Sequence, residues 1–285
     1  MFSVRELREL FTRHRFRPLK RLGQNFLIDG NVKDKIIGAA SVSKDDTVIE
    51  IGPGFGALTY DLAQDAGEVF AVEKDKALYK ILSEGALGKA SNVHLICGDI
   101  VDTDIEAIAG SKKVKIVGNL PYYATTPIIV FLIENRRFIK NATLTVQREV
   151  AVRLTSDPGT KEYGSISCFV QYYARLRYVH TITRECFYPH PEVDSSALRF
   201  DMLDSPSVSV ADEELFFRII RKAFNQRRKT IINSLTSKAL GTIASKDALL
   251  TALETARISP SARPETLGLQ DFADITRAVI AKSTH

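Results

Sequence analysis

The pattern of apolar and polar positions predicts strands that alternate with helices over the first two thirds of the chain. Four largely apolar runs predict strands, at residues 47–51, 69–72, 93–97 and 114–117, and the last of them is typical of a buried parallel strand. Further strands are expected at about residues 143–146, 177–182 and 197–202. Since helical segments separate the first strands, we expect an α/β fold with a doubly wound parallel sheet.

The chain changes character at residues 204–207, where Asp, Ser and Pro form a turn-prone linker. Beyond the linker, apolar residues recur at helical spacing, at about residues 215–224, 246–253 and 269–281. We therefore expect two domains. Residues 1–204 form the α/β domain with a basic N-terminal arm, and residues 205–285 form a small all-helical C-terminal domain.

Polar or glycine-rich groups follow each of the first four expected strands. These groups are the glycine turn at residues 52–56, Glu73, Asp99 and Asn119. The carboxyl ends of parallel strands meet at one edge of the sheet, which is where open α/β sheets bind ligands. The four groups are therefore expected to form one site.

The first three groups suit a nucleoside cofactor. Gly52 and Gly54 let the backbone approach a ligand closely and leave the N-terminus of the next helix free. Glu73 lies 21 positions after Gly52, where an acid accepts hydrogen bonds from a ribose diol. Asp99 is a suitable acceptor for an adenine amino group. The glycine pattern by itself also fits a dinucleotide such as NAD, so at this point both cofactors stay open.

The fourth group, Asn119-Leu120-Pro121-Tyr122, suits methylation of an exocyclic amine on a nucleobase. The amine's lone pair is delocalised into the ring, and hydrogen bonds to the Asn119 side-chain oxygen and the Leu120 carbonyl localise it toward a methyl donor. Tyr122 offers a flat face for stacking, and Pro121 stiffens the turn. The group supplies neither the catalytic acid or base nor the hydride pocket of a nicotinamide enzyme. S-adenosyl-L-methionine is therefore favoured over NAD.

A loop at residues 187–195 contains prolines at two alternate positions, which predicts a stiff, extended segment without regular pairing. Phe187 at its start can form the second face of a base sandwich opposite Tyr122, as enzymes that flip a base out of its stack require. The alternative is that Phe187 is an ordinary core residue.

The 285-residue chain carries a formal net charge of +5, which makes a polyanion the first partner to consider. Basic residues gather in the N-terminal arm and after the first helix of the C-terminal domain. The candidate phosphate contacts are Arg17, Lys20, Arg21, Arg227, Arg228 and Lys229. The alternative is that they form solvated helix faces.

Composition indicates in which compartment the protein works and whether it binds a metal. No apolar run approaches the roughly 20 residues of a membrane span, so no membrane partner is expected. The three cysteines are an odd number without paired metal spacing, which fits a reducing compartment such as the cytoplasm. Cys186 and His190 are at most half a zinc site, so we expect no metal.

Five stretches occur together along nearly the whole chain: Arg-Leu-Gly-Gln-Asn-Phe-Leu at 21–27, Glu-Ile-Gly-Pro-Gly at 50–54, Gly-Asn-Leu-Pro-Tyr at 118–122, the loop 187–195, and Ala-Phe-Asn-Gln-Arg-Arg-Lys-Thr at 223–230. In combination they resemble the small-subunit (16S) rRNA adenine N6,N6-dimethyltransferase family, the KsgA type. The resemblance implies a Rossmann-like S-adenosylmethionine-dependent methyltransferase domain followed by a helical rRNA-binding domain. It implies cofactor contacts at Asn25, Leu27, Gly52, Glu73, Asp99 and Asn119, and a target adenine held between Tyr122 and Phe187.

The resemblance also implies dimethylation of two adjacent adenosines near the 3′ end of small-subunit rRNA. We expect the chain to act as a monomer on rRNA within a pre-30S-like particle. Two alternatives stay open. One is a large-subunit rRNA or DNA adenine methyltransferase, and the other is a non-catalytic ribosome-assembly or transcription factor on the same fold. The intact set of Gly52, Glu73, Asp99 and Asn119 argues against a dead cofactor pocket.

Overall fold

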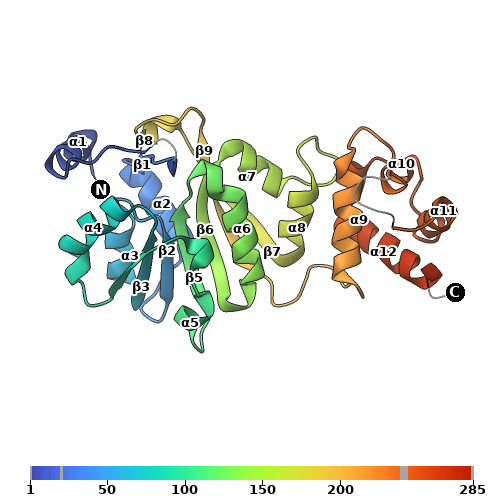
Figure 1. The fold of residues 1–285 in the computed structure, drawn as a ribbon, viewed down its shortest axis with the longest axis horizontal. Helices are drawn as coiled ribbons and strands as arrows, with labels where there is room; N and C mark the ends of the chain where they lie inside the picture. Colours follow the sequence, from blue (N-terminus) through green and yellow to red (C-terminus); the bar gives the residue numbers. More distant parts are fainter. Residues whose placement is uncertain (1, 20–21, 238–242, 284–285) are drawn as a thin grey trace. The chain divides into compact units, whose positions relative to one another are not determined.

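The structure is a computed structural model that describes residues 2–19, 22–237 and 243–283 (Figure 1). The chain forms two compact units. The first comprises Met1–Ala151 and Arg175–Asp204, and the second comprises Val152–Ala174 and Ser205–His285.

Across the described residues, seven strands form the central sheet of the first unit. In spatial order they are β4 (Val93–Cys97), β3 (Glu68–Glu73), β2 (Thr47–Ile51), β5 (Val114–Asn119), β6 (Ile139–Gln147), β9 (Ser195–Met202) and β7 (Ala174–Ile182). Neighbouring strands from β4 to β6 pair in parallel, and β9 pairs antiparallel with β6. The seven expected strands are all present. The central strands β2 and β5 are almost fully buried, as at Val48, Ile116 and Val117, whereas the edge strands β4 and β7 are partly exposed.

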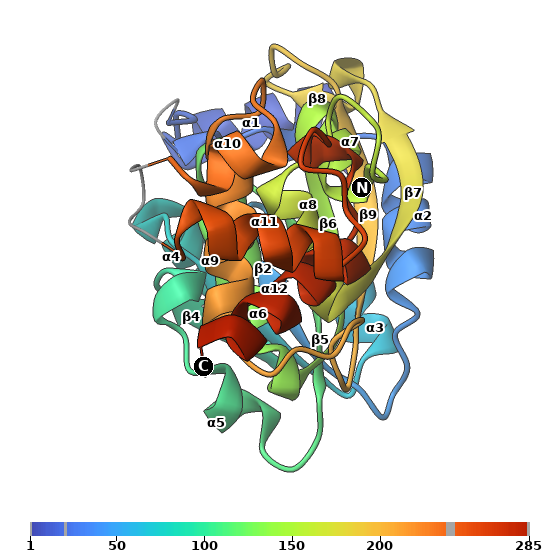
Figure 2. The same cartoon turned by 90° about the vertical axis from the view of Figure 1, so that its right-hand side faces the viewer.

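The direction of winding reverses beside β2. The chain moves outward from β2 to β3 and β4, and then returns to place β5 on the other side of β2. Right-handed crossovers consequently put the connecting helices on opposite faces of the sheet. The helices α2 (Gly30–Ala40), α3 (Thr59–Asp65) and α4 (Lys76–Glu84) share one hydrophobic cluster with the strands. Figure 2 shows α2 and α3 on the side opposite α6 (Thr125–Glu134).

A two-stranded sheet, β1 (Phe26–Leu27) with β8 (Phe187–Tyr188), lies outside the central sheet. The expectation that the 187–195 loop makes no regular pairing is therefore wrong for its first two residues. Leu27 is in register with Phe187, and Phe26 with Tyr188. The partner strand is distant in sequence, so a local pattern of prolines does not reveal it.

The N-terminal arm begins with α1 (Val4–Arg13), which Ser3 and Glu6 close with a reciprocal capping box. Its apolar side packs into an aromatic cluster that also contains Phe16, Phe26 and Phe55. The rings of Phe26 and Phe55 meet edge to face with centroids 5.1 Å apart. The arm is thus attached both to β1 and to the glycine turn after β2.

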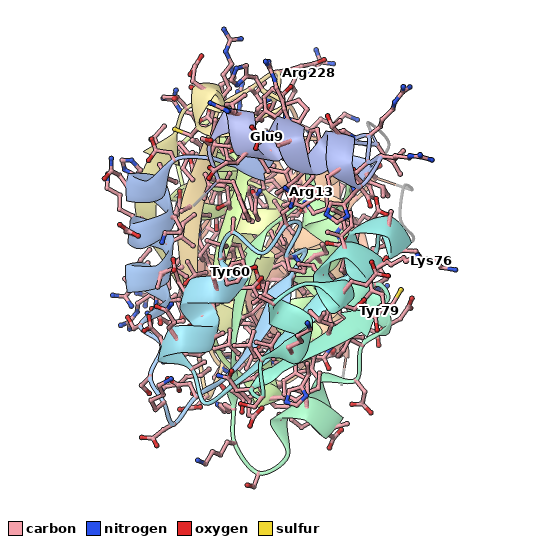
Figure 3. All side chains as sticks on the ribbon, turned by 90° about the vertical axis from the view of Figure 1, so that its left-hand side faces the viewer. Glu9, Arg13, Tyr60, Lys76, Tyr79 and Arg228 are labelled. Carbon is pink, nitrogen blue, oxygen red and sulfur yellow. The ribbon has the colours of Figure 1, made fainter. Side chains whose placement is uncertain are left out.

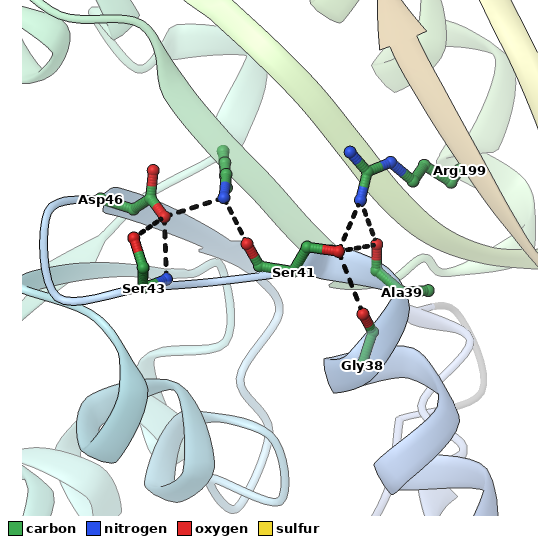
Figure 4. Close-up of polar contacts among 7 residues, drawn as sticks. Gly38, Ala39, Ser41, Ser43, Asp46 and Arg199 are labelled. Atoms are coloured by element: carbon green, nitrogen blue, oxygen red, sulfur yellow. Dashed lines mark hydrogen bonds and ion pairs between the residues drawn. The ribbon is translucent and has the colours of Figure 1, made fainter.

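The C-terminal end of α2 is held by two cations from the sheet, the buried Lys115 and the half-buried Arg199 (Figure 4). Lys115 on β5 donates to the Ser41 carbonyl and forms an ion pair with Asp46 at 2.8 Å. Arg199 on β9 donates to the Ala39 carbonyl and, at 3.0 Å, to the Ser41 hydroxyl. These bonds satisfy carbonyls that a helix end otherwise leaves free, so α2 is fixed to two strands.

The second unit is helical and consists of the end of α7 (Arg148–Thr155) with α8 (Ser165–Tyr173), α9 (Glu213–Asn225), α10 (Ile231–Leu235), α11 (Lys246–Thr255) and α12 (Leu269–Ser283). Tyr172 and Tyr173 of α8 donate to the Glu213 carboxylate of α9 at 3.1 and 2.7 Å. Their rings also contact Phe217. Because of these contacts residues 152–174 group with the C-terminal helices, whereas the expected division placed them in the first domain.

Among the residues that the structure describes, no helix is both long and apolar enough to cross a membrane.

Candidate functional site

A cavity lies at the carboxyl edge of the sheet, next to the point where the winding reverses. Every catalytic and cofactor-binding candidate from the sequence lines it: Asn25, Leu27, Gly52, Glu73, Asp99, Asn119, Leu120, Tyr122 and Phe187. The structure brings these residues together because consecutive parallel strands end at the same edge. Their individual roles stay predictions.

The glycine turn forms one wall of the cavity. Gly52, Gly54 and Gly56 have φ values of +68°, +61° and +88°, which are in the left-handed region that favours glycine. A Cβ atom on Gly54 would lie 3.1 Å from the Phe26 ring, and one on Gly56 would lie 2.5 Å from Leu87. The turn therefore needs residues without side chains, and it presents bare backbone to a ligand in the cavity.

Glu73, at the end of β3, is a buried carboxyl that two main-chain groups hold in place. Its oxygens accept from Gly54 N at 3.2 Å and from Asp75 N at 2.8 Å. Burial raises the pKa of Glu73 to about 7. Each carboxyl oxygen has a second lone pair, so the group can still accept bonds from a pair of hydroxyls.

Asp99 follows β4 and is already partly engaged. One oxygen forms an ion pair with the Lys74 ammonium at 2.6 Å, and the other accepts from Val101 N at 3.3 Å. Its side chain is only a quarter exposed, at 25%. An adenine amino group would have to share this carboxylate with Lys74.

The turn after β5 presents acceptors to the cavity and few donors. Asn119 donates through Nδ2 to the Asn25 carbonyl at 2.9 Å, a bond that assigns the orientation of the amide and leaves Oδ1 as an acceptor. The Leu120 N–H donates to the Thr145 carbonyl at 3.0 Å, and Pro121 has no N–H. This polarity matches an amine, which has N–H groups to donate.

Two aromatic side chains complete the cavity. The Tyr122 hydroxyl is 2.7 Å from the Ser195 hydroxyl, which fixes the half-buried ring. Phe187 is 1% exposed and belongs to the core cluster as well as to the lining. Phe187 is thus a core residue that also lines the cavity, and its role as a stacking face opposite Tyr122 stays a prediction.

Glu50 is a cavity residue that the sequence interpretation missed. It is 1% exposed, and its Oε2 atom has no hydrogen-bond partner among the described residues. Burial raises the pKa of Glu50 to about 8, with a smaller contribution in the same direction from the charge of Glu73. The sequence contained one sign of this site residue, namely an acidic residue inside an otherwise apolar strand.

The candidate phosphate contacts fall into three groups. Lys20 and Arg21 lie outside the described residues. Arg17, Arg228 and Lys229 are exposed, and Arg228 is visible at the surface in Figure 3. Arg227 is exposed as well, but it donates to the carbonyls of Lys161 and, at 2.9 Å, Tyr163 inside the second unit. Arg227 therefore has a structural task that the sequence did not indicate.

The doubly wound sheet, the glycine turn and the acceptor-rich turn define a Rossmann-like methyltransferase, a class in which the nucleoside of the methyl donor binds at the strand ends. The chain belongs to the family described as "Ribosomal RNA adenine dimethylase", whose model matches residues 14–277. The resemblance drawn from the five stretches is thereby confirmed.

Two curated relatives are both named ribosomal RNA small subunit methyltransferase A. The protein from Pelotomaculum thermopropionicum is 44% identical over 279 residues, with 94% of each chain covered. The protein from Moorella thermoacetica is 46% identical over 271 residues, with 92% of each chain covered.

Solved structures support the fold. A dimethyladenosine transferase from Plasmodium falciparum superimposes with a TM-score of 0.79 at 24% identity, covering 90% of this chain and 98% of the other. The 23S rRNA methyltransferase ErmE gives a TM-score of 0.70 at 25% identity, covering 90% of this chain and 100% of the other. The expected methyltransferase fold with a helical C-terminal part is thus confirmed.

Proposed function

We propose that this chain transfers methyl groups from S-adenosyl-L-methionine to N6 of two adjacent adenosines near the 3′ end of small-subunit (16S) rRNA, giving N6,N6-dimethyladenosine during late small-subunit assembly. The observation that carries the proposal is the acceptor-rich turn at Asn119–Tyr122 beside the glycine turn. The small-subunit substrate is supported by the names of the curated relatives.

The lining of the cavity supports the methyl donor as its ligand. The positive-φ glycine turn admits a ligand close to the backbone, and Glu73 has lone pairs available for a ribose diol. Asn25, Leu27, Gly52, Glu73, Asp99 and Asn119 are the proposed contacts. When bound, S-adenosylmethionine supplies a sulfonium-borne methyl group that a nucleophile can displace.

The protein's own contribution is to orient the amine and to increase its nucleophilicity. The adenine N–H groups donate to Asn119 Oδ1 and the Leu120 carbonyl, which localises the nitrogen lone pair toward the methyl group. Tyr122 and Phe187 hold the ring, since a base that has left its stack needs a replacement surface. The methylated amine is acidic and loses its proton after the transfer, so the reaction needs no strong catalytic base. Most of the rate enhancement then comes from holding the amine and the methyl group in position.

The proposed partner is small-subunit rRNA in a pre-30S-like particle in the cytoplasm, bound by a monomer. The exposed Arg17, Arg228 and Lys229 support it as phosphate contacts. The α/β unit is proposed to bind the donor and the helical unit to bind rRNA.

The test is to incubate the purified chain with labelled S-adenosylmethionine and one of four substrates: unmethylated small subunits, naked small-subunit rRNA, large-subunit rRNA or duplex DNA. We expect dimethyladenosine in small-subunit rRNA alone, measured by mass spectrometry of the digested nucleosides. Transfer to large-subunit rRNA would favour an activity like that named for ErmE. Donor binding without transfer to any substrate would favour a non-catalytic assembly factor.

A further inference from the structure

Tyr123 is an aromatic residue at the cavity with no role in the scheme above. It directly follows Tyr122 in a 3₁₀ turn, η4 (Tyr122–Ala124), and it belongs to the cavity lining. Its side chain is nevertheless 52% exposed, the largest exposed fraction among the large hydrophobic residues of the described chain. It therefore lies where the cavity meets solvent.

The geometry of the turn separates the two rings. A 3₁₀ helix has three residues per turn, so successive side chains point about 120° apart. Tyr122 is fixed on one side by its bond to Ser195, and Tyr123 consequently projects in another direction. Their Cα atoms are about 3.8 Å apart, as for any trans peptide. The turn thus offers one ring inside the cavity and a second ring at its mouth.

A cation stands in the same lining. Lys74 has a side chain that is 51% exposed, and its ammonium pairs with Asp99. An accessible aromatic face together with a basic side chain is the combination that proteins use to bind single-stranded nucleic acid. An isolated exposed tyrosine needs no explanation, but this one lies beside the residues proposed to hold the target base.

We propose that Tyr123 is a positioning residue that stacks the base next to the target adenosine while the target occupies the cavity. The inference rests on the proposed function, in which two adjacent adenosines are methylated. Two consecutive bases joined by one backbone link would meet two consecutive aromatic residues. Tyr123 would then select substrates in which the neighbour of the target has a large face for stacking.

The test is a cycle that combines a protein variant with an rRNA variant. Tyr123→Ala, Tyr123→Phe and wild type are assayed on two kinds of unmethylated small subunit. One carries the natural pair of adenosines, and in the other the neighbour of the target adenosine is replaced by uridine. The control is Tyr60→Ala, because Tyr60 on α3, labelled in Figure 3, is 42% exposed. Tyr60 is not among the residues that line this cavity. Binding of S-adenosylmethionine is measured separately for each variant.

On the natural pair we expect Tyr123→Ala to lower kcat/KM about tenfold, the size typical of losing one stacked base, mainly through a higher KM. Tyr123→Phe and Tyr60→Ala should match wild type, and donor binding should be unchanged. Replacing the neighbour by uridine should slow wild type several-fold, but it should slow Tyr123→Ala far less, because the stacking contact is already lost.

The same fractional loss for Tyr123→Ala on both particles, or a loss shared by Tyr123→Phe, would overturn the assignment of Tyr123. A wild-type chain that methylates neither particle would instead contradict the proposed function. The two failures are therefore distinguishable.

Discussion

Asn119 and Asn25 are joined by a hydrogen bond from the Asn119 amide to the Asn25 carbonyl, with Nδ2 and O 2.9 Å apart. The bond connects the last residue of β5 to the segment just before β1. Because the amide nitrogen is used in this way, the amide oxygen is the atom that remains to meet a substrate amine. One bond thus couples the proposed cofactor contact at Asn25 to the proposed catalytic acceptor.

We expect Asn119→Ala to lower kcat about 10²-fold or more, because it removes an acceptor whose bond strengthens as the amine attacks the methyl group. The dissociation constant of the methyl donor should change less than kcat. The measurements are single-turnover methylation and equilibrium donor binding. The matched control is Asn92→Ala, since Asn92 makes the same type of bond, to the Ala63 carbonyl at 2.9 Å. Near-normal turnover of Asn119→Ala would contradict the mechanism.

Tyr122 is expected to act through its ring and only weakly through its hydroxyl. Tyr122→Phe removes the bond to Ser195 but keeps the stacking face, so we expect kcat/KM to stay within about threefold of wild type. Tyr122→Ala should lower kcat/KM by tenfold or more, since stacking on an aromatic side chain contributes about 1–3 kcal/mol per base. Ser195→Ala breaks the same bond from the other side and should resemble Tyr122→Phe. Equal losses in all three variants would show that the ring face is not what matters.

The sequence alone was sufficient to predict the strands of the sheet and the edge of the sheet where the candidate site lies. Strands such as Thr47–Ile51 are buried on both faces, so their apolar runs identify them without knowledge of their neighbours. Parallel pairing then places the ends of β2 to β5 at one edge, which is why Gly52, Glu73 and Asn119 line one cavity.

Other features depend on contacts between distant segments, which a local pattern does not encode. β1 pairs with β8 across most of the first unit's sequence, and Arg227 bonds to carbonyls at Lys161 and Tyr163. α8 has the sequence of an ordinary packed helix, and its contacts with α9, among them the bonds to Glu213, group it with the second unit. Each of these features depends on a contact with a residue that is distant in the sequence.

The three basic residues at 227–229 in the second unit should have different roles, two as phosphate contacts and one as a structural residue. Arg228→Ala or Lys229→Ala should each reduce the slope of log affinity against log salt by about 1, because each removes one phosphate contact. Arg227→Ala should change that slope less and should destabilise the helical unit by about 1–3 kcal/mol, since it loses charged donors to two carbonyls. rRNA binding at several salt concentrations and urea denaturation separate the two effects. A slope unchanged in both Arg228→Ala and Lys229→Ala would exclude them as phosphate contacts.

Glu50 should make the stability of the first unit depend on pH. Burial raises the pKa of Glu50 from 4.5 to about 8, so between these values the native state keeps a proton that the unfolded chain releases. The unfolded state then binds fewer protons, and the free energy of unfolding falls as pH rises from about 4.5 to 8. A shift of this size corresponds to roughly 5 kcal/mol over the whole window.

Glu50→Gln removes the ionisable group and keeps its shape. We expect this variant to match wild type within about 1 kcal/mol at pH 5, where Glu50 is protonated in the native state, and to be several kcal/mol more stable at pH 9. Part of the decline should remain in the variant because burial also raises the pKa of Glu73, to about 7. Urea denaturation at pH 5, 7 and 9 measures the difference, with the exposed Glu84→Gln as control. Parallel pH profiles for Glu50→Gln and wild type would mean that Glu50 is charged in the folded protein at neutral pH, and that the cavity already contains a countercharge for it.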